Sequence, residues 1–247
     1  MTAPTGECPN CGKQTKRLVE EVAGRMFSVP VWCEKCVRSA LASHNQERMI
    51  GLKRKWKALC PALYRATDPN HPAIDQELLS KIREWDPAIA GIEGIGLHGP
   101  TAGCKTRMMF LLLSDLHFRG INVAWVHSIE LARASFEQFD SNAEIQKRAR
   151  NLWKNAAGVK VLLIDDIGKE RFTDAAEQNL YWLIERRILA CKPTLWTSNA
   201  SGAVLREFMS ESRGPALTRR LAEFSTVHFV PARHKRAESI DYLAASA

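Results

Sequence analysis

A glycine-bounded loop near the middle of the chain carries the clearest chemical information. Its sequence, GPTAGCKT, matches the phosphate-binding pattern G-x-x-x-x-G-K-[ST] at all but one position. Such a loop points backbone N–H groups at a phosphate beside the positive end of a helix. Lys105 would neutralise the β- and γ-phosphates, and the Thr106 hydroxyl would complete a Mg²⁺ shell. The predicted phosphate-binding residues are Gly99, Pro100, Thr101, Ala102, Gly103, Cys104, Lys105 and Thr106.

The departure from the pattern is Cys104, which stands where glycine is expected just before the lysine. A side chain there is unfavourable only if the loop needs a positive φ or a very close approach to phosphate. Lys105 and Thr106, which supply the charge and the metal ligand, are both present. The alternative interpretation is a strand, a turn and a helix whose glycines merely form the turn, so the rest of the chain has to decide.

Two adjacent carboxylates follow a nearly continuous apolar run at residues 159–164. Such a run is typical of a central parallel strand covered on both faces. Asp165 and Asp166 come at its carboxyl end, where open α/β sheets bind their ligands. Asp165 would hold Mg²⁺, mostly through water, and Asp166 would polarise the attacking water. Strand ends are often acidic. The pair indicates a magnesium and nucleotide site because it follows a phosphate loop.

A polar residue is expected beside this pair. Residues 193–199 are predicted to form a strand that ends in Thr-Ser-Asn. Because neighbouring parallel strands end at the same edge of a sheet, Asn199 can reach the γ-phosphate and the water. The alternative is that it caps a turn.

Four of the seven cysteines lie in the first 36 residues, as two C-x-x-C pairs. Their spacing is that of a two-knuckle zinc ribbon, in which metal coordination replaces a core too small to fold alone. Four thiolates leave no open coordination position, so we expect a structural Zn²⁺. A redox dithiol or four buried thiols are the alternatives. The predicted zinc ligands are Cys8, Cys11, Cys33 and Cys36.

The elements that must position these residues alternate between strands and helices. Two short strands are expected at residues 17–27 and 29–32, within the cysteine-rich segment. Further strands are expected at residues 94–98, 121–126, 159–164, 193–199 and 225–230. Helices are expected at residues 74–85, 106–116, 131–153 with a break near 140–142, 175–188, 203–209 and 215–224. This order predicts an α/β fold in which helices flank a parallel sheet.

The composition is that of an ordinary soluble chain of 247 residues, with 45% hydrophobic and 25% charged residues. No apolar run approaches the roughly 20 residues needed to cross a bilayer, and no apolar signal core is found, so we expect a cytoplasmic protein without a membrane partner. The net charge of +8 favours an anionic partner such as nucleic acid. One basic cluster surrounds Trp56. A second consists of Lys147, Arg148, Arg150 and Lys154. Either could be a solvated helix face.

Taken together, the strings HGPTAGCKT, LLIDDIGKE, LYWLIERRILACKPTLWTSN and ALTRRLAEF resemble the AAA+ ATPases of the DnaC/DnaI helicase-loader and IstB transposition-helper group. The resemblance covers about residues 60–230. It implies a P-loop AAA+ sheet without a C-terminal lid, and the cofactors ATP and Mg²⁺. It makes Lys105 and Thr106 the Walker A pair, and Asp165 and Asp166 the Walker B pair.

The resemblance also assigns two further roles. Asn199 corresponds to the sensor 1 residue. Arg220 matches the arginine of the family's x-R-L box and would reach the γ-phosphate bound by a neighbouring copy, with Arg219 in reserve. Such a finger implies a homo-oligomer in the ATP state. An N-terminal zinc module resembles the DnaI-type loaders, in which this module contacts the helicase.

These observations predict four segments and one main function. The segments are a Cys₄ zinc module at 1–40, a basic linker at 41–60, the AAA+ domain at 61–232 and a basic tail at 233–247. The main hypothesis is an ATP-dependent loader of a replicative helicase, bacterial or phage-borne, that binds single-stranded DNA. The alternatives are a transposition-helper ATPase acting on duplex DNA and a non-hydrolysing DNA-binding adaptor with a degenerate phosphate loop.

Overall fold

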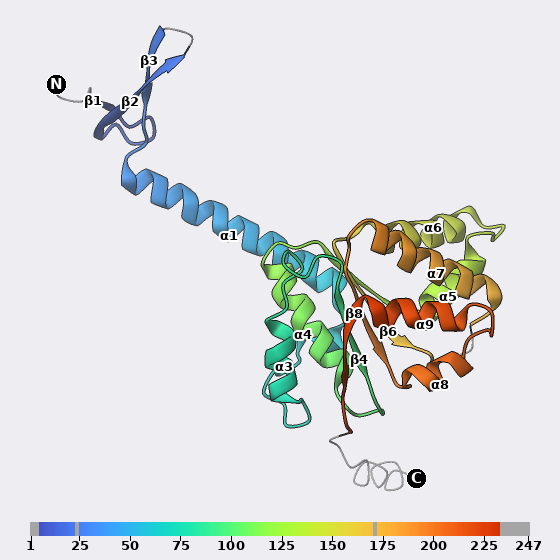
Figure 1. Cartoon of the computed structure of the whole chain (residues 1–247). Helices are drawn as coiled ribbons and strands as arrows, with labels where there is room; N and C mark the ends of the chain where they lie inside the picture. Colours follow the sequence, from blue (N-terminus) through green and yellow to red (C-terminus); the bar gives the residue numbers. More distant parts are fainter. Residues whose placement is uncertain (1–4, 23–24, 170–171, 233–247) are drawn as a thin grey trace, which may run out of the picture. The chain divides into compact units, whose positions relative to one another are not determined.

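The computed structural model describes residues 5–22, 25–169 and 172–232, and the chain forms two compact units, Met1–Lys55 and Trp56–Ala247 (Figure 1). The predicted basic tail at 233–247 lies outside the described residues. None of the described helices combines the length and the apolar character needed to cross a membrane.

The first unit holds a small antiparallel sheet and most of one long helix. Strands β1 (Thr5–Glu7), β2 (Gln14–Val22) and β3 (Arg25–Pro30) pair in sequence order. Helix α1 (Glu34–Leu59) begins at the residue after Cys33, so Cys36 lies in its first turn. Among the described residues of this unit, the only buried apolar ones are Cys8 and Cys36. The side chains described in this unit therefore do not form a hydrophobic core of their own.

The predicted strand boundaries in this unit were wrong. The sequence suggested one strand at residues 17–27 and another at 29–32. In the structure Val22 pairs with Arg25, so the stretch expected to be one strand contains the ends of both β2 and β3. Apolar and charged residues are mixed without strict alternation on both sides of the reversal, so the hydrophobic pattern alone does not mark where the strand turns back.

The second unit is built on a five-stranded parallel sheet, as predicted. Its strands are β4 (Gly94–His98), β5 (Val123–His127), β6 (Val161–Ile167), β7 (Thr194–Ser198) and β8 (Ser225–Phe229). They lie in the order β5-β6-β7-β4-β8, and every neighbouring pair is parallel. The sheet places the phosphate loop that follows β4 beside the ends of β7 and β8.

Helices cover both faces of this sheet (Figure 1). One face carries α2 (Ala62–Arg65), α3 (Gln76–Arg83), α4 (Lys105–Phe118) and the last turn of α1. The other carries α5 (Ser128–Glu137), α6 (Ala143–Gly158), α7 (Asp174–Leu189), α8 (Gly202–Glu207) and α9 (Gly214–Glu223). The first four residues of β6 are all apolar because Val161 and Leu163 face the first layer while Leu162 and Ile164 face the second.

A buried arginine ties the amino ends of β6 and β7 to the second helical layer. Arg187 of α7 is fully buried and uses all five of its N–H groups. They donate to the hydroxyl of Thr194 and to four carbonyl oxygens, at distances from 2.7 to 3.3 Å: those of Ala156, Val159, Lys160 and Pro193. Burial lowers the pKa of Arg187 to about 10, and the five acceptors keep the buried cation in place.

Candidate functional site

The phosphate loop runs from the end of β4 to the start of α4 and is held from behind by the chain that follows β8. The Val230 N–H donates to the His98 carbonyl at 2.7 Å. A Cβ added at Gly99, whose φ is 141°, would lie 2.2 Å from the Val230 carbonyl oxygen. A Cβ at Gly103 would lie 3.0 Å from the Val230 side chain and 3.2 Å from the Pro231 carbonyl oxygen. The loop therefore needs glycine at 99 because there is no room for a side chain.

Cys104 adopts the left-handed conformation, with φ 57° and ψ 19°. The condition under which a side chain is unfavourable at this position is therefore met, since a non-glycine residue in this region is strained by about 1–2 kcal/mol. The half-buried side chain of Cys104 packs against the apolar core beneath α4, which offsets part of this strain. Ala102 also has a positive φ, of 67°. Position 104 therefore keeps the backbone conformation typical of glycine although the residue is cysteine.

The Lys105 ammonium is buried and uses all three of its N–H groups within the protein. It donates to the carbonyl oxygens of Gly99 and Pro100 at 2.8 and 2.7 Å, and to the side-chain oxygen of Asn199 at 2.9 Å. Burial lowers the pKa of Lys105, while the nearby carboxylates of Asp166 and Asp165 act in the opposite direction. The acceptors lie where a bound phosphate would compete with them for the ammonium.

The structure brings Thr106 and Asp165 together, as the phosphate-loop interpretation requires. Both the Thr106 hydroxyl, at 2.8 Å, and the Thr197 hydroxyl, at 2.6 Å, donate to the same Asp165 oxygen. Asp165 is only 4% exposed and lies in a sheet irregularity between Ile164 and Ile167. A hydroxyl and a carboxylate oxygen at this distance are the hard oxygen ligands that Mg²⁺ takes alongside phosphate and water.

Asp166 is turned out of the strand into the same site. Its φ is 61°, and this conformation is held by hydrogen bonds from its N–H to the Thr197 hydroxyl and from the Ser128 hydroxyl to its carbonyl. One carboxylate oxygen accepts from the Asn199 amide at 2.6 Å. The other lies 3.5 Å from the Lys169 ammonium and 3.7 Å from the His127 ring nitrogen. Left-handed residues held in this way are frequent in active sites.

Asn199 links the two halves of the site with a single amide. Its oxygen accepts from Lys105 and its NH₂ group donates to Asp166, so each end of the amide has a partner of matching type. A change in either partner therefore reaches the other through this side chain.

The depression at the loop has a volume of about 280 Å³ and includes residues that sequence reasoning missed. These are Leu63, Tyr64, Arg107 and Thr197. The Tyr64 ring stacks on Phe110, with ring centroids 4.4 Å apart and planes 11° from parallel. Tyr64 lies three residues after Pro61, just beyond the start of the region that resembles the AAA+ group, and its aromatic type was the available signal. Thr197 could have been found as the hydroxyl two residues before Asn199, on the neighbouring strand.

The structure does not place either candidate arginine finger in this depression. Arg220 lies on α9, where its guanidinium donates to Glu185 of α7 at 2.6 Å and to Glu223 at 3.3 Å. Glu185 raises the pKa of Arg220 further above its ordinary value. Arg219 is exposed and forms no ion pair with any other described residue. Both remain predictions, and a contact with a second copy is the arrangement that they require.

The four N-terminal cysteines converge as the zinc-ribbon interpretation predicts. Their sulfur atoms all lie within 4.8 Å of one another, and the Cys11 and Cys33 sulfurs are 3.6 Å apart. Tetrahedral Zn²⁺–thiolate coordination places sulfur atoms about 3.8 Å apart. The Cys33 N–H and the Asn10 amide each donate to a sulfur, of Cys8 and Cys36 respectively, at 3.3 Å. The cluster therefore fits a Zn²⁺ ion, with donors supporting the thiolates.

The thiols of this cluster differ in their acidity. The Cys33 N–H, together with other nearby backbone amides, lowers the pKa of Cys8 to about 6. The Asn10 amide also favours the Cys36 thiolate, but the neighbouring sulfurs outweigh it and raise the pKa of Cys36 to about 12. Four thiolates at this spacing repel one another, so a divalent cation is the group that lets all four ionise together.

No protein-family model and no curated protein matches the sequence. Several solved structures are similar to it. A protein from Streptococcus pyogenes serotype M3, described as a primosome component, is 22% identical with a TM-score of 0.54 over 72% of this chain and 92% of that one. DnaI is 19% identical with a TM-score of 0.52 over 68% and 86%. The DnaC helicase loader is 18% identical with a TM-score of 0.50 over 62% and 86%.

At these identities the likeness shows the fold alone. The resemblance suggested by the motifs is therefore confirmed for the fold. The sheet order, the loop after β4 and the carboxylates at the end of β6 agree with that fold. This chain has the P-loop AAA+ fold of the DnaC and DnaI helicase loaders, together with an N-terminal cysteine cluster.

Proposed function

We propose that the protein is an ATPase of DNA replication initiation, which binds DNA and loads a replicative helicase in a bacterial or phage-infected cell. The observation that supports this most is the amide of Asn199, which joins the phosphate-loop lysine to the acid that follows β6. A turn made only for structural reasons needs no such link. The fold shared with helicase loaders supports the choice of process.

In this proposal the residues of the site exchange partners when ATP binds. Lys105 gives up the carbonyl oxygens of Gly99 and Pro100 and takes the β- and γ-phosphate oxygens instead. Thr106 and Asp165 would hold Mg²⁺, which would supply positive charge beside the phosphates. Asp166 orients and polarises the attacking water, and Asn199 positions it. The depression beside Leu63 and Tyr64 gives the base an apolar surface on which to lie.

Hydrolysis in this proposal depends on assembly. Arg220, or Arg219, would reach the γ-phosphate bound by a neighbouring copy, which makes turnover a property of the homo-oligomer. Arg220 is held by Glu185 and Glu223 in the single chain, so assembly has to offer it a better acceptor. A phosphate carries more charge than a carboxylate and accepts the same forked geometry.

The N-terminal unit contributes the contact with the helicase in this proposal. Zn²⁺ held by the four cysteines would stabilise the small sheet, on which the apolar side chains of Leu18 and Val29 are 49% and 46% exposed. Exposed apolar side chains on a metal-stabilised module are suited to packing against a partner protein.

The experiment that tests the proposal measures ATP binding and turnover by the zinc-loaded protein, with and without single-stranded DNA. We expect Lys105→Ala to lose ATP binding, and Arg220→Ala to keep binding and lose turnover. Retention of the cognate helicase by the wild type, but not by a variant lacking Cys8 and Cys11, tests the role of the N-terminal unit. ATP turnover that is normal in Arg220→Ala and Arg219→Ala would overturn the trans-acting finger.

One observation favours a second candidate, a DNA-binding adaptor that does not hydrolyse ATP. Cys104 is a strained residue in the left-handed region, and Lys105 is satisfied by protein acceptors. If the wild type binds no nucleotide while it still binds DNA and the helicase, this candidate replaces the first.

A further inference from the structure

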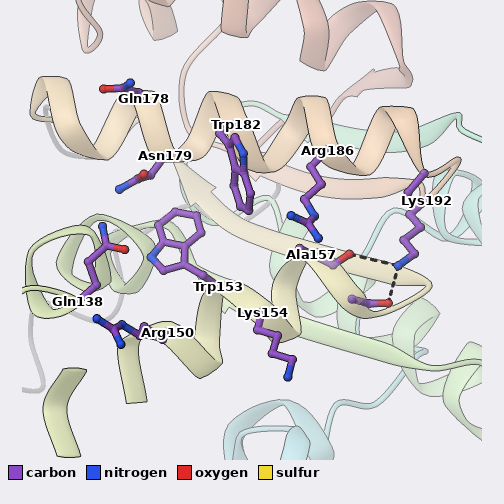
Figure 2. A pocket seen from close by; sticks show the side chains of 12 residues that line it. Gln138, Arg150, Trp153, Lys154, Ala157, Gln178, Asn179, Trp182, Arg186 and Lys192 are labelled. Carbon is purple, nitrogen blue, oxygen red and sulfur yellow. Dashed lines mark hydrogen bonds between the residues drawn. The ribbon is translucent and has the colours of Figure 1, made fainter. Parts of the chain in front are cut away.

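A groove between α6 and α7 lies apart from the nucleotide site and shares no lining residue with it. Its volume is about 740 Å³, which is in the range of sites that bind small organic groups. Figure 2 shows the side chains of Trp182 and Arg186 directed from α7 toward α6, with Trp153 between the two helices.

Helical spacing explains why these side chains meet. On α6, Arg150, Trp153 and Lys154 are three and four residues apart, so they share one face. On α7, Trp182 and Arg186 are four residues apart and share the face that looks toward α6. Lys192, which follows α7, closes one end of the groove by donating to the Ala157 and Gly158 carbonyls at 3.3 and 2.8 Å.

The groove is positively charged without local compensation. Four cations line it, namely Arg150, Lys154, Arg186 and Lys192, and no carboxylate does. Among the described residues none of the four forms an ion pair. By contrast, Arg148 on the same helix forms an ion pair with Glu137 at 3.2 Å. An uncompensated cluster of this kind is complementary to an anion.

Two tryptophans make the groove more than a charged patch. Trp182 is 47% exposed, and the Arg186 guanidinium lies 5.1 Å from the centre of its ring. Trp153 is 92% buried at the base of the groove, and its indole N–H has no acceptor among the described residues. An accessible aromatic face surrounded by cations is the combination by which proteins hold unpaired bases and the phosphates between them.

We propose that the α6–α7 groove binds single-stranded nucleic acid. A base stacks on the exposed face of Trp182 beside Arg186, and the flanking phosphates contact Arg150 and Lys154. Lys192 retains an N–H group beyond the two used by carbonyls, and it faces the same anionic backbone. This inference rests on the proposed function and adds to it the place where the strand binds. It also predicts strandedness, because bases in a duplex are already stacked on one another.

The same geometry divides the basic cluster that the sequence suggested as a nucleic-acid surface. Arg150 and Lys154 line the groove, whereas Lys147 and Arg148 do not. Arg148 therefore provides a matched control on the same helix, two residues from Arg150.

The test uses the full-length, zinc-loaded protein and a fluorescently labelled oligothymidylate, with affinity measured by anisotropy over a range of salt concentrations. We expect Trp182→Leu to weaken binding about tenfold and Trp182→Phe, which keeps a ring, to weaken it about threefold or less. Arg150→Ala and Lys154→Ala should each lower the slope of log K against log salt by about 0.7. Arg148→Ala should leave affinity and slope near those of the wild type.

Several outcomes would overturn the inference. Oligothymidylate binding that is unchanged in both Trp182→Leu and Arg150→Ala would place the strand elsewhere. Equal competition by polyglutamate would assign the groove to an acidic protein segment, and saturation by free thymidine monophosphate at the same concentration would assign it to a mononucleotide. Equal affinity for a duplex of the same length would contradict the stacking on Trp182.

ATP binding and turnover measured on the same variants separate this inference from the proposed function. Groove variants that lose the oligonucleotide but still bind ATP confirm the groove, whether or not the protein loads a helicase. Groove variants that bind the oligonucleotide normally refute it, even if ATP binding and helicase loading are both demonstrated.

Discussion

The two ends of the parallel sheet each contain a buried cation, and the two cations are satisfied in different ways. At the amino ends of β6 and β7, Arg187 gives all five N–H groups to four carbonyls and a hydroxyl. At the carboxyl ends, Lys105 gives all three N–H groups to two carbonyls and an amide. Neither cation has a carboxylate hydrogen-bonded to it, and both have a pKa lowered mainly by burial.

The difference lies in what surrounds each cation. The acceptors of Arg187 are four backbone carbonyls and the Thr194 hydroxyl, enclosed by helix and sheet, and the Arg187 side chain has no exposed surface. The acceptors of Lys105 belong to a loop and to a side chain that borders an open depression. A complete set of hydrogen bonds therefore does not by itself distinguish a structural cation from a binding one. The distinction is whether a competing anion can reach the cation.

The largest expected effect is on stability and comes from removing the buried cation at the amino end of the sheet. Arg187→Met removes every donor from five buried acceptors, and we expect the free energy of unfolding to fall by about 4 kcal/mol. Urea unfolding of the full chain measures it. Arg186→Met, on the exposed side of the same helix, should change it by no more than about 0.5 kcal/mol.

A second variant keeps this prediction testable if Arg187→Met does not fold. Arg187→Lys retains the charge and three donors but loses the planar fork, so an intermediate loss is expected. A loss below about 1 kcal/mol in both variants would show that the acceptors find water and that Arg187 is not the structural cation described here.

The next largest effect is on binding, at the carboxyl end. Lys105→Met should weaken ATP binding about 100-fold, because it removes charge-assisted hydrogen bonds to phosphate. Stability without nucleotide should change less than in Arg187→Met, because Lys105 and its partner Asn199 line the open depression, from which water can reach the space that the ammonium leaves. Calorimetric titration and urea unfolding separate the two quantities.

The matched control for that variant is Lys160→Met, which changes a lysine at the amino end that donates to the Cys191 carbonyl. It should leave ATP binding unchanged. If Lys105→Met instead lowers stability as much as Arg187→Met while ATP binding stays the same, the two cations are equivalent and the comparison fails.

A smaller effect is expected for the amide that joins Lys105 to Asp166. Asn199→Ala should lower ATP turnover about 20-fold, which is a loss near 2 kcal/mol, while ATP binding changes only a few-fold. The reason is that Lys105 keeps its phosphates, but Asp166 loses the group that orients it. Equal losses in binding and turnover would mean that Asn199 serves the loop alone.

The smallest effect concerns two cysteines with the same strained backbone, one at each end of the sheet. Cys104 has φ 57° and Cys191 has φ 50°. Replacing either with glycine should raise the free energy of unfolding by about 0.5–1 kcal/mol, measured by thermal or urea unfolding. Only Cys104→Gly should also change ATP affinity, raising it several-fold. An unchanged affinity would show that the cysteine does not hinder phosphate approach.

The sequence predicted the sheet and the pairing of Thr106 with Asp165 because both depend on local patterns. Strand ends and the helix start can be located from apolar runs and glycines, and parallel strands bring their ends together. Arg187 was not singled out, although Leu180, Leu183 and Ile184 precede it at helical spacing on the same buried face. That periodicity indicates burial. It does not reveal which carbonyls from α6, β6 and β7 converge there, because the packing of three separate segments decides it.

The conformation of Cys104 and the α6–α7 groove were out of reach for a similar reason. Backbone φ angles cannot be read from a sequence. The sequence therefore showed only that Cys104 would be strained if its φ were positive. The basic residues of α6 were noted, but Trp182 and Arg186 lie about 30 residues further on, and only the tertiary packing sets them opposite Arg150 and Lys154.

The support of the phosphate loop by Val230 has a practical consequence for protein engineering. Val230 and Pro231 form the back wall of the phosphate loop, since Gly99 and Gly103 lie within contact distance of them. A truncation that ends before β8 would leave the loop without this wall. An affinity tag or reporter protein intended to leave nucleotide binding intact should therefore be joined beyond Pro231, with a linker that does not pull on that residue.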